Sequence, residues 1–378
     1  MMENVDVAII GAGPAGSATA IGLAQRGYEV SLIDKRHFPR EKLCGDFVNP
    51  INWPVFRELG VTDRVLAETH GEVSGFRITN SAGREAEARF GSRYLQRSIG
   101  LGLRRAALDQ LLVQRAAELG ATTHLGCRVE KLSRSAQGWC LKIAEENWQA
   151  KLVIGADGRN SWVAQQLGLN RSAAMQGRSV GFQSRLHCAG AAGQIEIHLF
   201  PGGYAGVVSL GDGTINLAMA IDKRKLGGER GADFLFNKVL ARNPHLKEII
   251  DRCDSVAELR SVYPVYFPSR RRVIDGALLV GDAARVSEPV TGEGIYFAMR
   301  SGLLAAETID FALRRGNLAA AGLAGYERAC RRAFRSRLVL NALMRFAVYR
   351  PALIDPFIRL SAKNGRLLNS LVDSVCVP

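Results

Sequence analysis

The chain has 378 residues, 47% of them hydrophobic and 23% charged, which is enough apolar material for a large α/β unit or two domains and excludes a disordered chain or a coiled coil. Its net charge is +14, with Arg supplying 40 of the 50 basic residues. Such a surface attracts anions, namely nucleic acid, an anionic membrane, or a phosphorylated cofactor or substrate. Because no basic stretch is interleaved with aromatic residues, we expect no nucleic-acid partner.

The seven cysteines are scattered, odd in number and free of any Cys-x-x-Cys pair. This pattern favours a reduced protein, and we expect no disulfide framework and no metal site. Glu3 and Asp6 precede the first apolar run, where a secretion signal needs basic residues. No apolar run approaches the ~18 residues of a membrane-spanning helix. We therefore expect a cytoplasmic protein.

The N-terminal segment has the pattern of a phosphate-binding loop. Residues 5–10 are predicted as a buried strand, and Gly11, Gly13 and Gly16 follow it directly. A helix rich in small residues is then predicted to about Arg26. The first glycine permits a tight turn, the second lets a pyrophosphate approach the backbone, and the third lets the helix pack closely on the strand. The N–H groups of the helix N-terminus face the phosphates.

A second strand, residues 29–33, ends at Asp34 and completes a β-α-β unit. A carboxylate at this position accepts hydrogen bonds from a ribose 2′-hydroxyl and disfavours a 2′-phosphate. The N-terminal segment therefore predicts dinucleotide binding.

Three later segments extend this pattern. Residues 152–161 are predicted as a strand that ends in the turn Asp157-Gly158. Residues 277–284 form a third strand with Gly281-Asp282 at its end, and a glycine turn at residues 292–294 precedes a helix that runs to about Arg314. Arg105 is predicted at the start of an amphipathic helix.

In this order, the segments resemble the para-hydroxybenzoate hydroxylase-like FAD enzymes and, within them, the geranylgeranyl reductase family. Residues 38–46 (FPREKLCGD) and 281–295 carry the most specific part of the likeness. The resemblance implies that Asp157-Gly158 touches the pyrophosphate region, that Asp282 binds the ribityl chain, and that the 292–294 turn lies against the flavin pyrimidine. A glycine turn at a helix N-terminus also stabilises negative charge on a reduced flavin. The cofactor is therefore expected to be FAD, with NAD(P)H or another donor supplying electrons. The predicted FAD-binding residues are Gly11, Gly13, Pro14, Ala15, Gly16, Asp34, Lys35, Arg40, Cys44, Gly45, Arg105, Asp157, Gly158, Gly281, Asp282, Pro289, Gly292, Glu293, Gly294 and Ile295.

The middle of the chain has the pattern of a second sheet. Apolar residues alternate at 180–188 and 195–199, and residues 207–210 and 215–221 flank a Gly-Asp-Gly turn typical of a hairpin. We expect an antiparallel sheet with one covered face. Between the two later FAD motifs, it matches the substrate domain of the resembled family, so the active site is expected between this sheet and the flavin.

Five residues are candidates for substrate binding or catalysis. Phe200, Pro201 and Gly202 form the most pocket-like stretch, although only Phe-Pro remains of the Tyr-x-Trp-x-Phe-Pro pattern common in geranylgeranyl reductases. Cys44 is a candidate redox or catalytic residue and His198 a candidate acid or base. Arg285 stands where the family usually has Gly, and it either meets an anionic substrate or caps a surface.

The C-terminal segment is basic and amphipathic. Residues 327–366 contain ten Arg and Lys against two acids, and we expect Pro351 and Pro356 to break it into short helices. Its apolar face either packs on the substrate domain or lies on an anionic membrane, so peripheral membrane contact is one expectation. The predicted division is an FAD-binding domain of residues 1–72, 98–169 and 272–325, a substrate domain of residues 73–97 and 170–271, and a C-terminal basic helical segment of residues 326–378.

The sequence thus predicts a doubly wound, Rossmann-like FAD domain with an inserted antiparallel-sheet domain. The expected function is hydride transfer between flavin N5 and a C–C bond of a small apolar or carrier-bound substrate, such as an isoprenoid or polyketide. The alternative is an FAD-dependent monooxygenase, an aromatic or polyketide hydroxylase that uses a flavin C4a-hydroperoxide, because the same fold hosts both chemistries. A halogenase is disfavoured, since the Trp-x-Trp-x-Ile-Pro motif is missing. A third alternative is a non-catalytic protein in which FAD is only structural.

Overall fold

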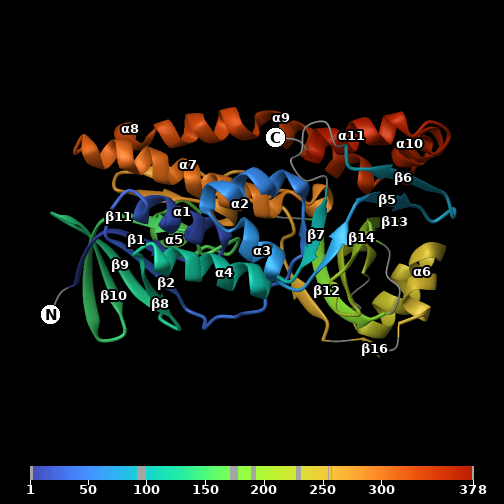
Figure 1. The fold of residues 1–378 in the computed structure, drawn as a ribbon, viewed down its shortest axis with the longest axis horizontal. Helices are drawn as coiled ribbons and strands as arrows, with labels where there is room; N and C mark the ends of the chain where they lie inside the picture. The colour runs from blue at the N-terminus through green and yellow to red at the C-terminus, as the bar shows by residue number, and fades with distance from the viewer. Residues whose placement is uncertain are drawn as a thin grey trace.

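The computed structural model describes most of the chain as two sheets side by side under a layer of C-terminal helices (Figure 1). The described residues are 3–91, 99–170, 178–188, 193–226, 231–253, 255–256 and 258–376. The predicted domain boundary between residues 97 and 98 lies outside them, as do residues 171–177 of the predicted substrate domain.

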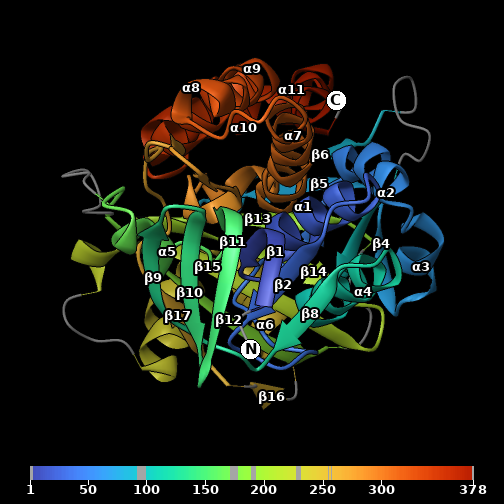
Figure 2. The same ribbon diagram turned by 90° about the vertical axis from the view of Figure 1, so that its left-hand side faces the viewer.

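The first sheet is the predicted dinucleotide-binding sheet. Its strands lie in the order β18-β19-β11-β1-β2-β8, and β19, β11, β1, β2 and β8 run parallel. Helices α1, α4 and α7 pack on one face, while the antiparallel strands β9 and β10 extend from β11 (Figure 2). The bounds are β1 Glu3–Ile10, β2 Val30–Asp34, β8 Thr122–Leu125, β9 Val129–Ser135, β10 Gly138–Ile143, β11 Glu146–Gly155, β18 Val273–Ile274, β19 Ala277–Leu279, α1 Pro14–Ala24, α4 Arg105–Glu118, α5 Trp162–Gln166 and α7 Gly294–Arg314. The predicted fold class is confirmed.

Small residues in α1 have a packing reason. A Cβ on Gly302 of α7 would lie 2.4 Å from the carbonyl oxygen of Ala15, and one on Gly22 would lie 2.8 Å from the Cβ of Ala306. Helices α1 and α7 therefore pack closely and in parallel, with the first turn of α1 opposite Gly302, so both N-termini point to the same end of the sheet.

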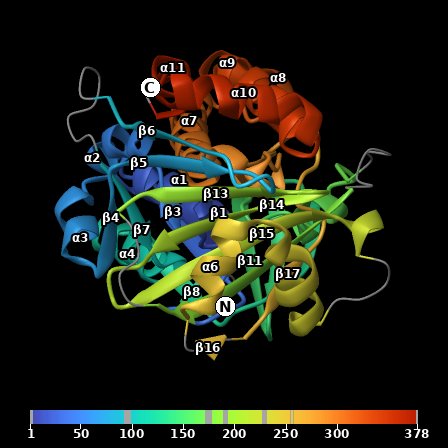
Figure 3. The same cartoon turned by 90° about the vertical axis from the view of Figure 1, so that its right-hand side faces the viewer.

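The second sheet has the order β16-β12-β15-β14-β13-β5-β6, and β17 also pairs with β12. The predicted hairpin of β14 and β15 is confirmed, but β13 and β5 pair in parallel, so the sheet is not wholly antiparallel. Both faces are covered, because β13 is buried along its whole length and α6 packs on one side (Figure 3). The bounds are β5 Gly75–Thr79, β6 Glu85–Arg89, β12 Ser179–His187, β13 Ile195–Phe200, β14 Gly203–Ser209, β15 Thr214–Asp222, β16 Ser255–Val256, β17 Arg260–Val262 and α6 Pro244–Asp251.

A small third sheet, β3-β7-β4, lies with helices α2 and α3 at the junction of the two larger sheets. The bounds are β3 Phe47–Val48, β4 His70–Val73, β7 Gly100–Leu103, α2 Trp53–Leu59 and α3 Thr62–Ala67.

The C-terminal helices cover both sheets from one side (Figure 1). They are α8 Ala320–Leu323, α9 Gly325–Val348, α10 Pro351–Lys363 and α11 Arg366–Cys376. Pro351 begins α10 as expected, but Pro356 lies inside that helix and does not break it, because Ile354 and Ile358 on either side are buried against the second sheet. Within the described residues, no helix is long and apolar enough to cross a membrane.

Candidate active site

The main cavity lies where the first sheet meets the second. Its volume is about 1400 Å³, including space open to solvent. One end is formed by loops at the carboxyl ends of β1, β11 and β19, the place where open α/β sheets bind ligands. The other end is formed by side chains of the second sheet. The cavity therefore has a loop-lined half and an apolar half.

The N-termini of α1 and α7 both open onto the loop-lined half. Gly13 and Pro14 start α1 there, and Gly294 starts α7. A Cβ added to Gly45 or Gly294 would meet nothing within 4 Å, so the backbone faces open space at both positions. Two helix N-termini beside one space create a site for negative charge.

Other glycines are required by backbone packing. Gly11 has φ +108°, and a Cβ on it would lie 2.4 Å from the carbonyl oxygen of Ala156. A Cβ on Gly16 would lie 1.9 Å from the carbonyl oxygen of Gly11. These two glycines therefore shape the loop, while Gly13 lines the cavity.

Asp34 supports this loop from behind. Its carboxylate accepts the N–H of Ala12 at 2.9 Å and the N–H of Arg36 at 3.0 Å, and it lies 3.7 Å from the guanidinium of Arg40. Arg40 also pairs with Asp109 at 3.2 Å. Asp34 and Arg40 thus fix the phosphate loop and do not line the cavity in this structure.

Cations surround the loop-lined half. Arg105 lines it and forms two hydrogen bonds to the buried carboxylate of Asp109, at 2.9 and 3.0 Å. Burial disfavours the charged form of Arg105, but the carboxylate of Asp109 keeps the pKa of Arg105 above its ordinary value. Lys42, which sequence analysis did not select, also lines the cavity, and desolvation lowers its pKa. A Cβ added to Gly158 would lie 3.7 Å from the Nζ of Lys42.

The remaining predicted positions divide between the cavity wall and its supports. Asp282 lines the cavity and lies 3.9 Å from Arg159, which sequence analysis also missed. Asp157 instead accepts the N–H of Val163 at 3.0 Å, and burial raises its pKa. Glu293 turns away to Arg337, at 2.8 Å.

The predicted FAD-binding residues therefore fall into two sets. Those that line the cavity are Gly13, Pro14, Ala15, Cys44, Gly45, Arg105, Gly158, Asp282, Pro289, Gly292, Gly294 and Ile295. Those that do not are Gly11, Gly16, Asp34, Lys35, Arg40, Asp157, Gly281 and Glu293, and of these Lys35 is exposed.

The second sheet gives the cavity an apolar wall. It has Phe and branched or flexible aliphatic side chains from five strands and lies opposite the two helix N-termini. We call this half the chamber; its wall residues are Phe76, Phe182, Ile195, Ile197, Tyr204, Gly206, Ala218, Met219, Ala220, Val262 and Val265. Apolar surface on one side and a few polar groups on the other are typical of small-molecule sites.

The structure does not bring His198 or the Phe-Pro-Gly stretch to this wall. Along β13, Ile195 and Ile197 face the chamber, so the intervening side chains face away. His198 is fully buried, its Nδ1 lies 2.8 Å from Thr79 Oγ1, and burial lowers its pKa to about 3. Phe200 packs in the core on the far face, and Pro201 and Gly202 form the turn beyond it. The prediction that His198 is an acid or base and that residues 200–202 bind substrate is therefore corrected. Strand alternation turns this stretch away from the chamber, and the sequence analysis did not take that alternation into account.

Cys44 does line the cavity, on a loop that the second sheet holds in place. Its N–H donates to Gln183 Oε1 at 3.3 Å, and its carbonyl accepts Asn216 Nδ2 at 3.1 Å. The side chains of Gln183 and Asn216 form a hydrogen bond with each other at 2.6 Å. Desolvation raises the pKa of the Cys44 thiol, so the thiol is protonated at neutral pH.

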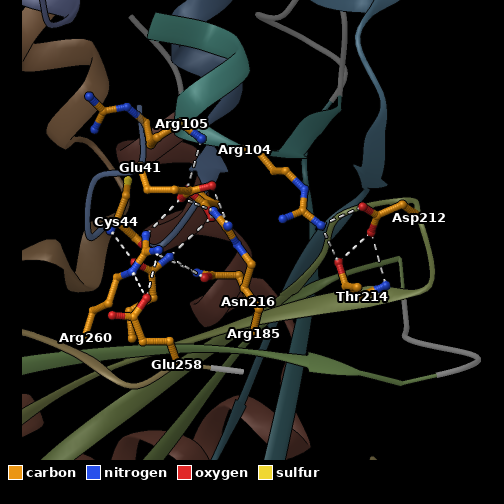
Figure 4. A network of polar contacts seen from close by, with 12 residues as sticks. Glu41, Cys44, Arg104, Arg105, Arg185, Asp212, Thr214, Asn216, Glu258 and Arg260 are labelled. Carbon is orange, nitrogen blue, oxygen red and sulfur yellow. Dashed lines mark hydrogen bonds and ion pairs between the residues drawn. The ribbon is translucent and has the colours of Figure 1, made fainter. Parts of the chain in front are cut away.

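Asp46 fixes the end of the same loop. It has φ +50°, and its carboxylate accepts the N–H of Arg105 at 3.2 Å and the guanidinium of Arg185 at 3.1 Å. Burial raises the pKa of Asp46 to about 6, and Arg185 opposes that rise. Arg185 also donates two hydrogen bonds to Glu41, at 2.8 and 2.9 Å, so strand β12 anchors both ends of residues 41–46 (Figure 4).

The fold and the cavity define a class: a dinucleotide-binding α/β protein whose second sheet closes an apolar chamber over the nucleotide loops. A family model described as an FAD binding domain matches residues 4–341. Digeranylgeranylglycerophospholipid reductase of Methanosphaerula palustris is 30% identical over 354 residues, covering 88% of this chain and 82% of its own length. The reductase of the same name from Methanothrix thermoacetophila is 28% identical over 392 residues, covering 98% and 91%. The chain belongs to the geranylgeranyl reductase family of FAD-dependent oxidoreductases.

Solved structures agree with the fold. A flavoprotein/dehydrogenase from Cytophaga hutchinsonii has a TM-score of 0.84 at 19% identity, covering 98% of this chain and 93% of its own. The flavin-dependent brominase Bmp2 has a TM-score of 0.81 at 19% identity, covering 99% and 94%. The flavin-dependent halogenase CmlS has a TM-score of 0.77 at 23% identity, covering 89% of this chain; this chain spans 63% of that protein.

The residues present fit FAD. Open space beside Gly45 and Gly294, two helix N-termini and the cations Lys42 and Arg105 suit a negatively charged dinucleotide. Asp282 offers a carboxylate for the ribityl hydroxyls, as the resemblance implied.

Proposed function

We propose that this protein is an FAD-dependent reductase that adds hydrogen across a C–C double bond of an apolar substrate held in the chamber. The observation that carries the proposal is the chamber wall, which is almost wholly apolar and faces the flavin-binding loops across one continuous cavity. A wall of this kind binds an alkyl or isoprenyl chain by removing it from water, at about 25 cal/mol per Å² of apolar surface.

The chain's own residues position the cofactor. The α1 N-terminus with Lys42 holds the pyrophosphate, Asp282 the ribityl chain, and the α7 N-terminus the pyrimidine edge of the ring, where it stabilises negative charge. The flavin, when bound, supplies the hydride.

Reduction of a C–C double bond also needs a proton for the second carbon. Two groups on the loop beside the flavin site carry a proton and line the cavity, Lys42 and Cys44; Lys42 is used for the pyrophosphate, which leaves the Cys44 thiol, whose pKa is raised by burial. The Tyr204 hydroxyl, by contrast, donates to Glu288 at 2.7 Å. We assign the proton to the Cys44 Sγ, which solvent reprotonates after the thiolate forms.

The substrate class follows from the chamber and from the relatives. Digeranylgeranylglycerophospholipid is a lipid with long isoprenoid chains, and the relatives above are named as its reductases. Isoprenoids therefore lead the substrate proposal, with polyketides as a second apolar class; NAD(P)H or another donor supplies the electrons.

A lipid substrate gives the C-terminal helices a role. Val339, Leu343 and Phe346 form an exposed apolar stripe on α9, and Leu353 and Leu360 are exposed on α10. The same helices also carry exposed cations, including Arg332, Arg335, Arg359 and Lys363. We propose that this face, the α9–α10 stripe, rests on an anionic lipid surface.

The experiment is anaerobic turnover of the FAD-loaded protein with a chemical reductant and geranylgeranyl lipids, read by mass spectrometry. A product that gains two hydrogens supports the proposal, and Cys44→Ala should lower its yield while Cys127→Ala, on the far side of the first sheet, does not. A product that forms only with oxygen and gains an oxygen atom identifies the monooxygenase and contradicts the proposal.

A further inference from the structure

A second pocket lies beside the flavin cavity, beneath the loop that carries Asp282. It lies between that loop, α7 and α9, and it shares Asp282, Ser287 and Ala298 with the flavin cavity. Its volume is about 420 Å³, including space open to solvent. We call it the anion pocket; its other wall residues are Arg272, Gly281, Ala284, Arg285, Phe297, Ser301, Tyr326, Cys330, Phe334 and Leu338.

Two guanidinium groups line this pocket, and neither forms an ion pair with another described residue. They belong to Arg272 and Arg285, and Arg345 lies near them with its guanidinium 4.1 Å above the ring of Tyr266. Burial lowers the pKa of Arg285, and the positive charges of Arg272 and Arg345 act in the same direction. Arginine stays charged in proteins, so three cations held together gain stability from a bound anion.

Two guanidinium donors in and beside the pocket also lack hydrogen-bond partners among the described residues. The Nε of Arg285 in the pocket and the Nε of Arg345 beside it are both buried without a hydrogen bond to any described residue. Buried donors are normally paired, and two unpaired guanidinium donors near each other indicate a missing acceptor.

The nearby acids are already engaged. Asp282 faces Arg159 at 3.9 Å, and Glu327 accepts the backbone N–H of Arg272 at 3.3 Å. Glu288 accepts the hydroxyl groups of Tyr204 and Tyr349. Among the described residues these acids already have partners, so an external anion is the acceptor that fits the pocket.

We propose that the anion pocket binds the phosphate group of a ligand that is used together with the flavin. Guanidinium pairs match the oxygens of phosphate in geometry and charge. Two ligands of the reaction carry such a group: a nicotinamide dinucleotide donor, and a substrate with a phosphorylated headgroup. The proposal goes beyond the proposed flavin reaction, and it holds whether the phosphorylated ligand is the electron donor or the substrate.

The test is calorimetric titration of the FAD-loaded protein with inorganic phosphate at constant ionic strength. We expect saturable binding that Arg285→Gln weakens by at least about tenfold and that Arg272→Gln also weakens. Arg332→Gln removes the same charge from an exposed position on α9 and should leave phosphate affinity unchanged. Arg285→Lys keeps the charge but loses the planar fork, and should bind with intermediate affinity if Arg285→Gln fails to fold.

Competition experiments distinguish the two possible ligands, a nicotinamide dinucleotide donor and a substrate with a phosphorylated headgroup. Displacement of phosphate by NADPH but not by NADH assigns the pocket to the donor's 2′-phosphate. Displacement by geranylgeranyl diphosphate but not by geranylgeraniol assigns it to a substrate headgroup. The absence of saturable phosphate binding, equal binding by Arg285→Gln, or displacement by none of these ligands overturns the proposal. Because none of these measurements requires turnover, failure here leaves the proposed reduction untouched.

Discussion

Arg185, on strand β12 of the second sheet, donates to the buried carboxylate of Asp46 at 3.1 Å and so holds the loop that carries Cys44 against the cavity. The pair joins residues 139 positions apart, and the same guanidinium holds Glu41 at the other end of the loop. The substrate sheet thereby fixes part of the flavin site as well as the chamber.

The first prediction concerns this pair. Asp46 has a pKa of about 6 in the folded chain, against about 3.9 when unfolded, so its contribution to stability falls as pH rises from about 4 to about 6 and is constant above. In Arg185→Gln, the buried carboxylate of Asp46 loses its cationic partner, and this lowers stability only when the carboxylate is ionised. We expect a loss of about 2–4 kcal/mol at pH 8, measured by denaturant unfolding, and a clearly smaller loss at pH 5.

Arg260→Gln is the matched control, because Arg260 contacts Glu41 and Glu258 but is more exposed. Its expected cost is below about 1 kcal/mol at both pH values. Equal losses for Arg185→Gln at pH 5 and pH 8 would show that Asp46 does not titrate in this range.

The second prediction compares two glycines of the flavin site. Gly294→Val places its side chain in open space, so the melting temperature of the cofactor-free protein should be unchanged while FAD content falls. Gly16→Ala drives a Cβ into the carbonyl of Gly11 and should destabilise the fold by about 3 kcal/mol or more. Normal FAD content in Gly294→Val would place the flavin elsewhere.

The third prediction tests the chamber. A Cβ on Gly206 would lie 3.7 Å from the Ile197 Cδ1, at the chamber wall. Gly206→Leu should therefore raise KM for long isoprenoid chains more than for short ones, with FAD content unchanged, and Gly206→Ala should have a smaller effect. If chain length made no difference to the Leu variant, the chain would bind outside the chamber.

The fourth prediction tests the α9–α10 stripe by vesicle sedimentation. Leu343 and Phe346 are 61% and 54% exposed, so Glu at both positions should leave the fold intact. Binding to phosphatidylglycerol vesicles should fall several-fold. Phe311→Glu, a similarly exposed residue on α7, is the control. Failure of the wild-type protein to sediment with anionic vesicles would contradict the proposed membrane contact.

The sequence predicted the flavin half of the site better than the substrate half, for a physical reason. Gly11, Gly13 and Gly16 act through local backbone geometry, so their spacing alone predicted the strand, turn and α1. His198 was a candidate acid or base because its residue type is often catalytic, but the face of the sheet that it occupies depends on which side of β13 meets the cavity.

Other features depend on contacts between distant segments. Lys42 and Asp46 gain their environments from α4 and β12, and no local pattern shows this. Pro356 was expected to end a helix, yet burial of Ile354 and Ile358 carries α10 through it.

The most direct test of the proposed function is anaerobic stopped-flow absorbance of the chemically reduced, FAD-loaded protein mixed with a geranylgeranyl lipid. The proposal predicts that the absorbance of oxidised flavin returns without oxygen, at a rate that rises with lipid concentration, and that a saturated product appears in equal amount. Flavin that stays reduced with the lipid until oxygen is added, and then yields an oxygenated lipid, would contradict it.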